Sequence, residues 1–316
     1  MRTNRTFVLG AALLALVVSA CSPGEGESPA ASTDAGASAS QAADLPAITI
    51  GSQSFWESAV VAEIYAQALE DAGFTVERSL ELGARDVTQP ALVGGDLDLM
   101  PEYIGGLLAV SYGGEPTPDI DASLEALRTE LEADGLVALE PTPGTDADGF
   151  AVRQETADEL GLATMSDLAE VAGDLKWGVA QECGENPNCG PGLERVYGID
   201  YESLDLETLG ACTTAIAEAL NASNIDVAQV CTTQPEIAGF NLVLLEDDQS
   251  LAPAQNIVPV ARQELVDEAG DVLETTLNAV SELLTTEELT NLGAAIILNG
   301  ESYEDAAAQW LEDNGL

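Results

Sequence analysis

The spacing of hydrophobic and polar residues changes along the chain, from the two-residue period of strands to the longer period of helices. Residues 96–100 alternate acidic and apolar side chains, which is typical of a strand, and Pro101 is expected to end it because proline donates no ladder hydrogen bond. Residues 104–110 are small or apolar and suit the start of a helix. Tyr103 is therefore predicted on a strand-to-helix loop, where ligands bind in open α/β sheets.

A second junction of the same kind lies earlier in the chain. Residues 47–52 predict a short buried strand and residues 59–72 an apolar-periodic helix. Ser54 is predicted to cap this helix, with Glu57 completing a capping box. Free N–H groups at the helix start would then favour an anionic ligand group.

The same patterns extend over the rest of the chain. Strands are predicted at 74–80, 136–140, 149–152, 175–180, 225–231, 242–246 and 256–261, and helices at 85–93, 119–134, 155–160, 165–171, 190–197, 213–222, 235–239, 264–284, 286–298 and 303–313. Thr286 is predicted to cap one of the last three helices. Strands that alternate with helices indicate an α/β protein with doubly wound parallel sheets.

The order of elements predicts two lobes joined by a two-segment hinge. Lobe 1 is expected to comprise residues 46–146 and 253–316, and lobe 2 residues 147–252. The chain would pass between the lobes near 143–147 and again near 252–259, and a double crossing restricts relative motion to closure around a cleft.

The N-terminus has the features of an export signal. Two arginines precede the apolar run 7–18, which is short for a membrane span and ends in small residues before Cys21. We expect a signal peptide at 1–20, lipidation of Cys21, and a flexible tether over 21–45, which is rich in Ser, Ala, Gly and Pro. An uncleaved membrane anchor is the alternative, and it would need a longer helix.

The chain is strongly acidic, with 56 Asp and Glu against nine Lys and Arg. This charge opposes binding to nucleic acid and would concentrate cationic solutes, but solubility, salty surroundings or genomic composition explain it better. The sequence has no histidine. It also lacks a G-x-S-x-G motif, a P-loop and a GxGxxG after a strand, so we predict neither an enzyme nor a bound cofactor.

Four cysteines follow Cys21, an even number that favours disulfides in an exported chain. Cys183 and Cys189 flank a turn-rich loop, and Cys212 and Cys231 are placed to meet at one edge of the second lobe. We expect these two pairs among the three possible pairings. A zinc site is the alternative, but separations of 6 and 19 residues match no CxxC pattern.

Several segments resemble one protein family. ITIGSQSFWES, YAQALEDAGF and ALVGGDLDLMPEYIGG are followed in order by FAVRQETADELGLATMSDLA, GPGLERVYG, DVAQVCTT, LVLLEDD and NIVPVAR. They resemble the substrate-binding proteins of ABC transporters for glycine betaine, choline and related osmoprotectants. The resemblance implies the type II periplasmic-binding-protein fold, an aromatic cage for a trimethylammonium group and a permease as partner.

The resemblance also assigns positions of the cage. Tyr103 corresponds to one cage tyrosine, although its ring could instead only pack the loop. Asp148, Cys231 and Gln255 stand where aromatic residues are common, and Gln53 stands where a basic residue is frequent. Three aromatic faces are therefore replaced, each worth about 0.5–2 kcal/mol towards a quaternary ammonium.

Other residues are expected to contribute to the site. Trp56 could restore one aromatic face or point into the core, and Ser54 lies on the same loop. Asp148 could favour an amine that donates hydrogen bonds, or be a surface carboxylate. Thr232 and Thr233 could face the cleft or cap the next helix.

These expectations define a membrane-tethered, monomeric solute receptor on the extracytoplasmic side. It would capture glycine betaine, choline or a related amine between its lobes and deliver it to the permease of an ABC importer. The alternatives are a different small cationic or polar solute, or a sensor or adhesin lipoprotein that does not take part in transport.

Overall fold

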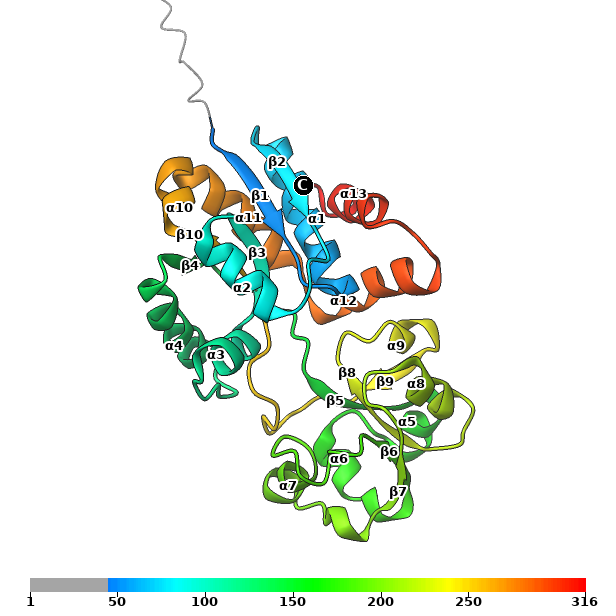
Figure 1. Ribbon diagram of the computed structural model, residues 1–316. Helices are drawn as coiled ribbons and strands as arrows, with labels where there is room; N and C mark the ends of the chain where they lie inside the picture. Colours follow the sequence, from blue (N-terminus) through cyan, green and yellow to red (C-terminus); the bar gives the residue numbers. More distant parts are fainter. Residues whose placement is uncertain (1–44) are drawn as a thin grey trace, which may run out of the picture. The chain divides into compact units, whose positions relative to one another are not determined.

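The computed structural model describes residues 45–316 (Figure 1). Cys21, the expected signal peptide and nearly all of the expected tether lie outside these residues. Within the described part of the chain, no helix is both long enough and apolar enough to cross a membrane.

Two five-stranded sheets form the framework, and the first has the order β2-β1-β3-β10-β4. Its strands are β1 (Ala47–Gly51), β2 (Thr75–Ser79), β3 (Leu99–Tyr103), β4 (Leu136–Ala138) and β10 (Ile257–Arg262). β1 runs parallel to β2 and β3, whereas β10 runs antiparallel to β3 and β4. The sheet is thus mixed rather than purely parallel, because β10 joins it after the chain has passed through all the strands of the second sheet.

The second sheet has the order β7-β6-β8-β5-β9. Its strands are β5 (Asp148–Arg153), β6 (Lys176–Val179), β7 (Asp205–Thr208), β8 (Val227–Cys231) and β9 (Leu242–Leu244). β5, the first strand after the crossing, pairs antiparallel with β8 and β9, and β6 runs parallel to β7 and β8. The hydrophobic pattern missed the edge strand β7, whose sequence DLET contains a single apolar residue.

Helices cover both faces of the first sheet (Figure 1). One face is covered by α1 (Trp56–Asp71), α10 (Gln263–Ala269), α11 (Asp271–Leu283), α12 (Thr286–Gly293) with the π-helical turn η4 (Ala294–Leu298), and α13 (Tyr303–Asn314). The other is covered by α2 (Arg85–Gly94), α3 (Ile104–Tyr112) and α4 (Ile120–Ala133).

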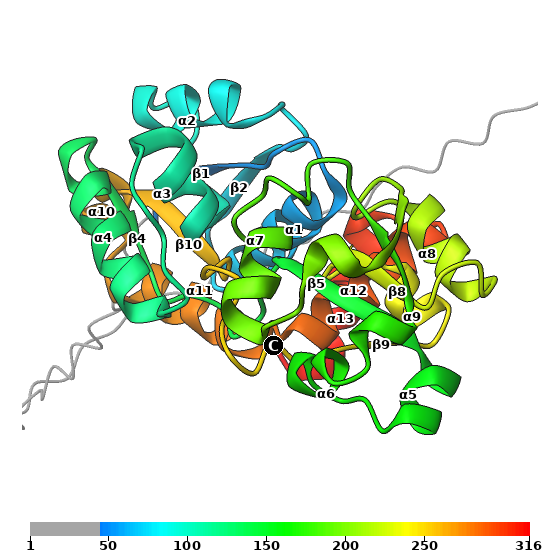
Figure 2. The same ribbon diagram turned by 90° about the horizontal axis from the view of Figure 1, so that it is seen from below.

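The second sheet is covered in the same way (Figure 2). One face packs against α5 (Gln154–Leu160), α6 (Met165–Ala169), α7 (Gly190–Gly192) and the short turns η1 (Ala172–Asp174), η2 (Leu193–Tyr197) and η3 (Tyr201–Ser203). The other packs against α8 (Thr214–Asn221) and α9 (Glu236–Gly239). Both sheets are therefore doubly wound.

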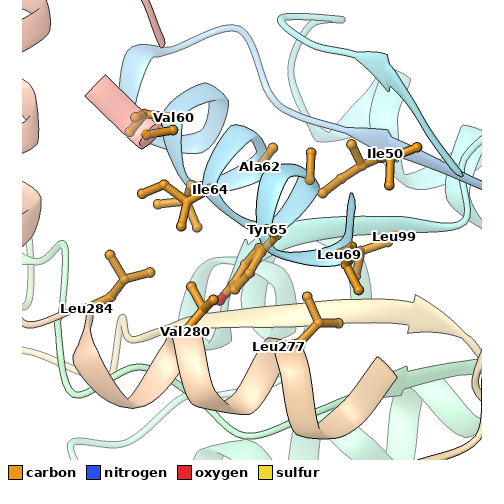
Figure 3. Close-up of a cluster of buried hydrophobic side chains, with 14 of the residues drawn as sticks. Ile50, Val60, Ala62, Ile64, Tyr65, Leu69, Leu99, Leu277, Val280 and Leu284 are labelled. Atoms are coloured by element: carbon orange, nitrogen blue, oxygen red, sulfur yellow. The ribbon is translucent and has the colours of Figure 1, made fainter. Parts of the chain in front are cut away.

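Helix α1 is the centre of the first core (Figure 3). Its small and β-branched residues let it lie close to the sheet on one side and to α11 on the other, so that most of its side chains are buried. The ring of Tyr65 reaches α11, where its hydroxyl pairs with Ser281 at 2.8 Å, which satisfies a buried polar group.

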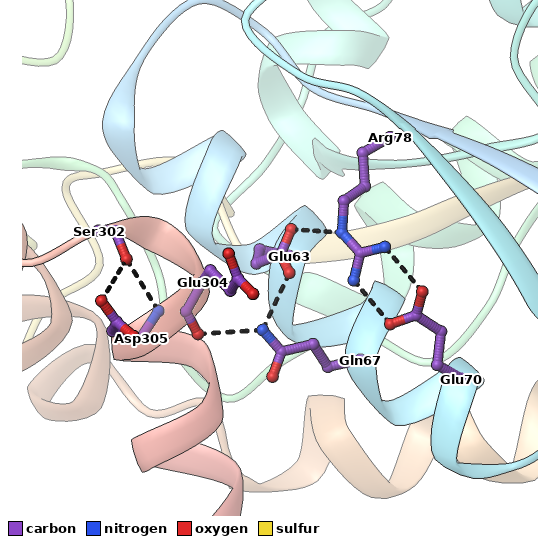
Figure 4. Close-up of polar contacts among 7 residues, drawn as sticks. All are labelled: Glu63, Gln67, Glu70, Arg78, Ser302, Glu304 and Asp305. Carbon is purple, nitrogen blue, oxygen red and sulfur yellow. Dashed lines mark hydrogen bonds and ion pairs between the residues drawn. The ribbon is translucent and has the colours of Figure 1, made fainter. Parts of the chain in front are cut away.

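Polar contacts attach α1 to β2 and to the last helix (Figure 4). The guanidinium of Arg78 binds Glu63 at 2.7 Å and Glu70 at 2.8 Å. The side-chain amide of Gln67 donates both to Glu63 and to the backbone carbonyl of Glu304 in α13. These bonds fix α13 against α1, so the end of the chain becomes part of the first lobe.

The chain crosses between the sheets twice, and the two crossing segments pair with each other. Thr145 and Asn256 form an isolated antiparallel bridge. The Asn256 side chain donates to the carbonyl of Thr142 at 3.0 Å, and the Thr142 hydroxyl accepts from the N–H of Ile257. The crossing is therefore a paired ribbon with its own hydrogen bonds.

The prediction that Pro101 ends the strand was wrong. β3 begins at Leu99 and runs through Pro101 to Tyr103, and Pro101 lies directly opposite Pro259 of β10. Because the two prolines face each other, neither leaves a backbone N–H of the other strand without an acceptor. On its other side, β3 pairs with β1 only at Leu99. The missing N–H is therefore not required on either side.

Three further local predictions were also wrong. The N-cap of α1 is Phe55 without a side-chain bond, because Ser54 donates its N–H to the carbonyl of Gly83 and its side chain is exposed. The cap of α12 is Thr285, one residue before Thr286. The single helix expected over 264–284 is divided at Gly270, whose φ of 63° interrupts the helical backbone.

Candidate functional site

Tyr103 ends β3 and starts α3, so that its position is fixed by the sheet and by the helix together. The residue is only 5% exposed. Its hydroxyl donates a 2.6 Å hydrogen bond to Oε1 of Glu57, which lies in the first turn of α1 and is 1% exposed. Burial, followed by the negative charge of Glu57, raises the pKa of the Tyr103 hydroxyl well above its usual value.

Two side chains contact the ring of Tyr103. The ring of Phe55 lies tilted at a centroid distance of 5.8 Å, and the guanidinium carbon of Arg85 lies 5.9 Å from the ring centroid. Arg85 also binds Glu102, a fully buried carboxylate, at 2.9 Å. Burial raises the pKa of Glu102, and the charge of Arg85 acts in the opposite direction.

A second carboxylate reaches Glu57 from the first crossing segment. Asp146 accepts a 2.8 Å hydrogen bond from the hydroxyl of Thr233, which follows β8 in the second lobe. Burial first, and then the charge of Asp146, raise the pKa of Glu57 to about 8. Burial is also the main cause that raises the pKa of Asp146, to about 6. We call Glu57 and Asp146 the acid pair.

Some buried polar atoms of Glu57 and of residues near the acid pair and Thr233 in sequence have no hydrogen-bond partner. Among the described residues these include Oε2 of Glu57, Nε2 of Gln53 and Oε1 of Gln234. Gln53 precedes Glu57 by four residues and Gln234 directly follows Thr233, and both are 4% exposed. Because buried polar groups are normally paired, these atoms provide an acceptor or a donor for a polar ligand.

Asp148 lies opposite Cys231 in the pairing of β5 with β8. Cys231 forms a disulfide with Cys212, and the expected Cys183–Cys189 disulfide is also present. The amide of Asn186, within the loop that this second bridge closes, lies 3.5 Å from the carboxylate of Asp148. Burial raises the pKa of Asp148. All four sulfurs are in disulfides, so none is free to bind zinc.

Residues 46–313 match the family model described as the substrate binding domain of ABC-type glycine betaine transport systems. The chain belongs to this family. It is 26% identical to the glycine betaine-binding protein YehZ of Escherichia coli, a match that covers 85% of this chain and 90% of the relative. It is 30% identical to the carnitine transport binding protein OpuCC of Listeria monocytogenes, with coverage of 78% and 79%.

Solved structures agree with this assignment. The chain resembles apo YehZ from Escherichia coli with a TM-score of 0.77 at 26% identity, covering 85% of this chain and 99% of that one. A protein described as a glycine betaine/carnitine/choline ABC transporter gives a TM-score of 0.78 at 23% identity, with coverage of 85% and 98%, which supports the fold. The predicted fold class, the membership of a betaine-type transport family and the absence of enzymatic function are thereby confirmed.

The side chains of the remaining predicted site residues of this betaine-type binding protein make no hydrogen bond to the carboxylates of the acid pair, although the backbone carbonyl of Gln255 accepts from the N–H of Asp146 at 3.2 Å. Trp56 is half-buried, and its ring and Pro235 of the second lobe both lie close to Gly293 of α12. The hydroxyl of Thr232 bonds to the first crossing segment: it donates to the carbonyl of Thr145 and accepts from the N–H of Ala147. Gln255 accepts a 3.0 Å bond from the N–H of Gly106 in α3.

A cavity of about 400 Å³ lies on the other side of the first crossing segment. Thr145 and Ala147 line it, whereas Asp146 between them does not, as expected where alternate side chains of an extended chain point in opposite directions. Its walls are largely apolar and include Phe150 and Met165. Asp148 and Thr232, two of the predicted site residues, also line this cavity, whereas Glu57, Gln53 and Gln234, which carry the unpaired buried atoms, do not.

Sequence reasoning missed several residues of the polar cluster. Glu57 was assigned to helix capping, and Asp146, Arg85 and Glu102 were not considered. A signal for Asp146 existed, because it lies in the segment predicted to cross between the lobes. For Glu57, the signal was its place beside Trp56 on the strand-to-helix loop.

Proposed function

We propose that the protein captures a small betaine-like or amine solute between its two lobes and delivers it to the permease of an ABC importer. The observation that carries this proposal is the buried polar cluster assembled from separate parts of the chain. Glu57 and Tyr103 come from the first lobe, Asp146 from the crossing segment and Thr233 from the second lobe. Such a cluster is complete only when the lobes are together.

Capture then follows from the contacts that each lobe contributes. A solute enters while the lobes are apart and meets the ring of Tyr103 and the carboxylate of Glu57. Closure adds Asp146 and Thr233, with the charge of Asp148 close to Asp146. A ligand stabilises the closed form only by contacts that it does not make in the open form, and these residues provide them. The closed form is the shape that the permease would recognise.

The ligand is expected to be a cation or a zwitterion with a compact ammonium group. Carboxylates and one tyrosine ring surround the site, and both attract positive charge. Glycine betaine, choline, carnitine and related amines have this group. A different small cationic solute is the second candidate, because Asp148, Cys231 and Gln255 stand where the resemblance places aromatic rings.

The N-terminal sequence supports a position on the outer face of the cell membrane. We propose lipidation at Cys21 after removal of residues 1–20, with residues 21–45 as the tether. The folded part would act as a monomer, and its acidity opposes contact with nucleic acid. Metabolic labelling with a palmitate analogue tests the anchor, because Cys21→Ala should abolish incorporation of the label.

Calorimetric titration tests the binding function. At least one of glycine betaine, choline, carnitine, proline betaine and a polyamine should bind to the purified protein. Tyr103→Ala should weaken that binding by roughly 1 kcal/mol or more, whereas Tyr303→Ala on α13 should leave it unchanged. No binding by any amine of the panel would contradict the proposal.

A further inference from the structure

We propose that the ligand's cationic group carries at least one N–H and donates it to Oε2 of Glu57. The protein would then prefer protonated amines to their quaternary counterparts. This inference rests on the proposed function and specifies the class of solute that the site takes. It is carried by the free carboxylate oxygen of Glu57 and by the surroundings of Tyr103.

Glu57 has one satisfied oxygen and one free oxygen. Oε1 accepts from Tyr103 at 2.6 Å, while Oε2 is buried and has no partner. The nearby hydroxyl of Thr233 has a single proton, which it gives to Asp146. When Glu57 is ionised, Oε2 therefore has no hydrogen-bond donor among the described residues. Because the pKa of Glu57 is raised to about 8, binding of an ammonium N–H at pH 7.5 displaces the proton of this carboxyl, and a quaternary ammonium has no N–H with which to replace it.

The aromatic surface needed by a quaternary ammonium is small at this position. Tyr103 is 5% exposed, with Phe55 and the guanidinium of Arg85 both near its ring. A cation already placed over the ring weakens its attraction for a second one. Tyr103 thus acts here mainly as a hydrogen-bond donor to Glu57.

The charges around Oε2 favour a cation that forms hydrogen bonds. Asp146 faces Glu57 from the crossing segment, and Asp148 lies close enough to Asp146 to raise its pKa. The base nearest to Tyr103 is Arg85, which is paired with Glu102. A bound cation would favour the ionised form of these carboxyls, and a charge-assisted N–H bond to Oε2 stabilises that form more than a contact with a methylated nitrogen does.

Gln53 adds a complementary donor. Its Nε2 is buried without a partner, and its backbone N–H is held by the hydroxyl of Ser58 at 3.0 Å, so the residue is fixed by its main chain. An oxygen of the ligand would satisfy Nε2. N,N-dimethylglycine and N,N-dimethylethanolamine each combine one N–H, in their protonated form, with an oxygen acceptor.

Matched pairs of ligands test the inference directly. Glycine betaine and N,N-dimethylglycine differ by one methyl group, as do choline and N,N-dimethylethanolamine, and both dimethyl compounds are largely protonated at pH 7.5. Calorimetry should show the dimethyl member of at least one pair binding about tenfold or more tightly, the scale of one charge-assisted hydrogen bond.

Glu57→Gln provides the second arm. Because the Tyr103 hydroxyl holds the amide oxygen, the amide nitrogen replaces Oε2, and the preference within each pair should fall to about one or invert. Glu63→Gln, a buried carboxylate outside the cluster, should retain the preference, and thermal unfolding will show that both variants are folded. Equal or tighter binding of the quaternary members would overturn the inference and leave the proposed function standing. Binding of neither member of either pair, nor of any other amine, would overturn both.

Discussion

The hydroxyl of Thr233 donates a 2.8 Å hydrogen bond to Oδ1 of Asp146. Thr233 belongs to the second lobe and Asp146 to the crossing segment, so this bond places a second-lobe donor beside the acid pair. The single proton of this hydroxyl cannot also be donated to the ionised carboxylate of Glu57, whose Oε2 has no partner among the described residues. The arrangement thus leaves one carboxylate oxygen for a ligand while it fixes the position of the other carboxylate.

Thr233→Val keeps the shape of the side chain and removes this donor. The hydrogen bond from Thr233 lowers the pKa of Asp146, so in the variant that pKa should rise above about 6. The free energy of unfolding at pH 8 should fall by about 1–3 kcal/mol, because a buried carboxylate loses a partner. Carboxyl NMR titration and urea unfolding measure the two effects, and Thr129→Val on the exposed face of α4 is the control. An unchanged Asp146 pKa would show that the bond is not formed in solution.

Stability should depend on pH through the acid pair. Folding raises the pKa of Glu57 from 4.5 to about 8 and that of Asp146 from 3.8 to about 6. The folded protein therefore binds these protons more tightly than the unfolded chain does. The free energy of unfolding should fall as pH rises, between about 4 and 6 for Asp146 and between about 4.5 and 8 for Glu57.

The slope is at most about 1.4 kcal/mol per pH unit for each group. Glu57→Gln removes one of the two groups, so its unfolding free energy should change less than that of the wild type between pH 6 and 8. Glu63→Gln should keep the wild-type slope. Urea unfolding at a series of pH values measures this, and parallel curves for wild type and Glu57→Gln would contradict the raised pKa.

Much of the fold follows from the hydrophobic pattern, because most helices and every strand except β7 have a periodicity of their own. The hydrophobic pattern does not give the direction of a strand. The sequence of β10 resembles that of the other strands, and β10 runs antiparallel because the chain returns to the first sheet from the second. Residue Pro101 shows the same limit, since a proline is tolerated here only through the distant Pro259. The N-cap of α1 is Phe55 rather than Ser54 for a similar reason. The N–H of Ser54 donates to the carbonyl of Gly83, a contact distant in sequence that a local capping motif does not reveal.

The site was predictable only in part. Tyr103 was found because its strand-to-helix junction is local in sequence. The acid pair was not, because their places on a strand-to-helix junction and on a crossing segment are weak signals among 56 Asp and Glu residues. Burial distinguishes Glu57 and Asp146 from the other acidic residues, and their burial depends on how the two lobes pack around the crossing segment.

Contact between the lobes away from the crossing should matter for affinity. A Cβ on Gly293 of α12 would lie 2.7 Å from the ring of Trp56 and 2.8 Å from Cγ of Pro235 in the second lobe. Gly293→Ala should therefore cost the closed form about 1–3 kcal/mol, or about fivefold or more in affinity. Gly94→Ala, at a helix end with nothing within 4 Å, is the matched control. Equal affinities for the two variants would mean that this contact takes no part in closure.

The two disulfides should differ in their contribution to stability. In the loop-entropy description a bridge stabilises more when it closes a longer loop. Cys212–Cys231 spans 19 residues and Cys183–Cys189 spans 6. Replacing both cysteines by alanine should cost about 3 kcal/mol for the first bridge and about 2 kcal/mol for the second. Urea unfolding of the two double variants compares them, and a larger loss for the shorter loop would contradict the description.

A crystal structure of the protein with its tightest-binding amine tests the central claim most directly. The account predicts the ligand between the lobes, with its nitrogen at about 2.7–3.2 Å from Oε2 of Glu57 and with Tyr103 and Thr233 beside it. A ligand found instead in the apolar cavity lined by Thr145 and Ala147, or on the surface of a single lobe, would contradict it.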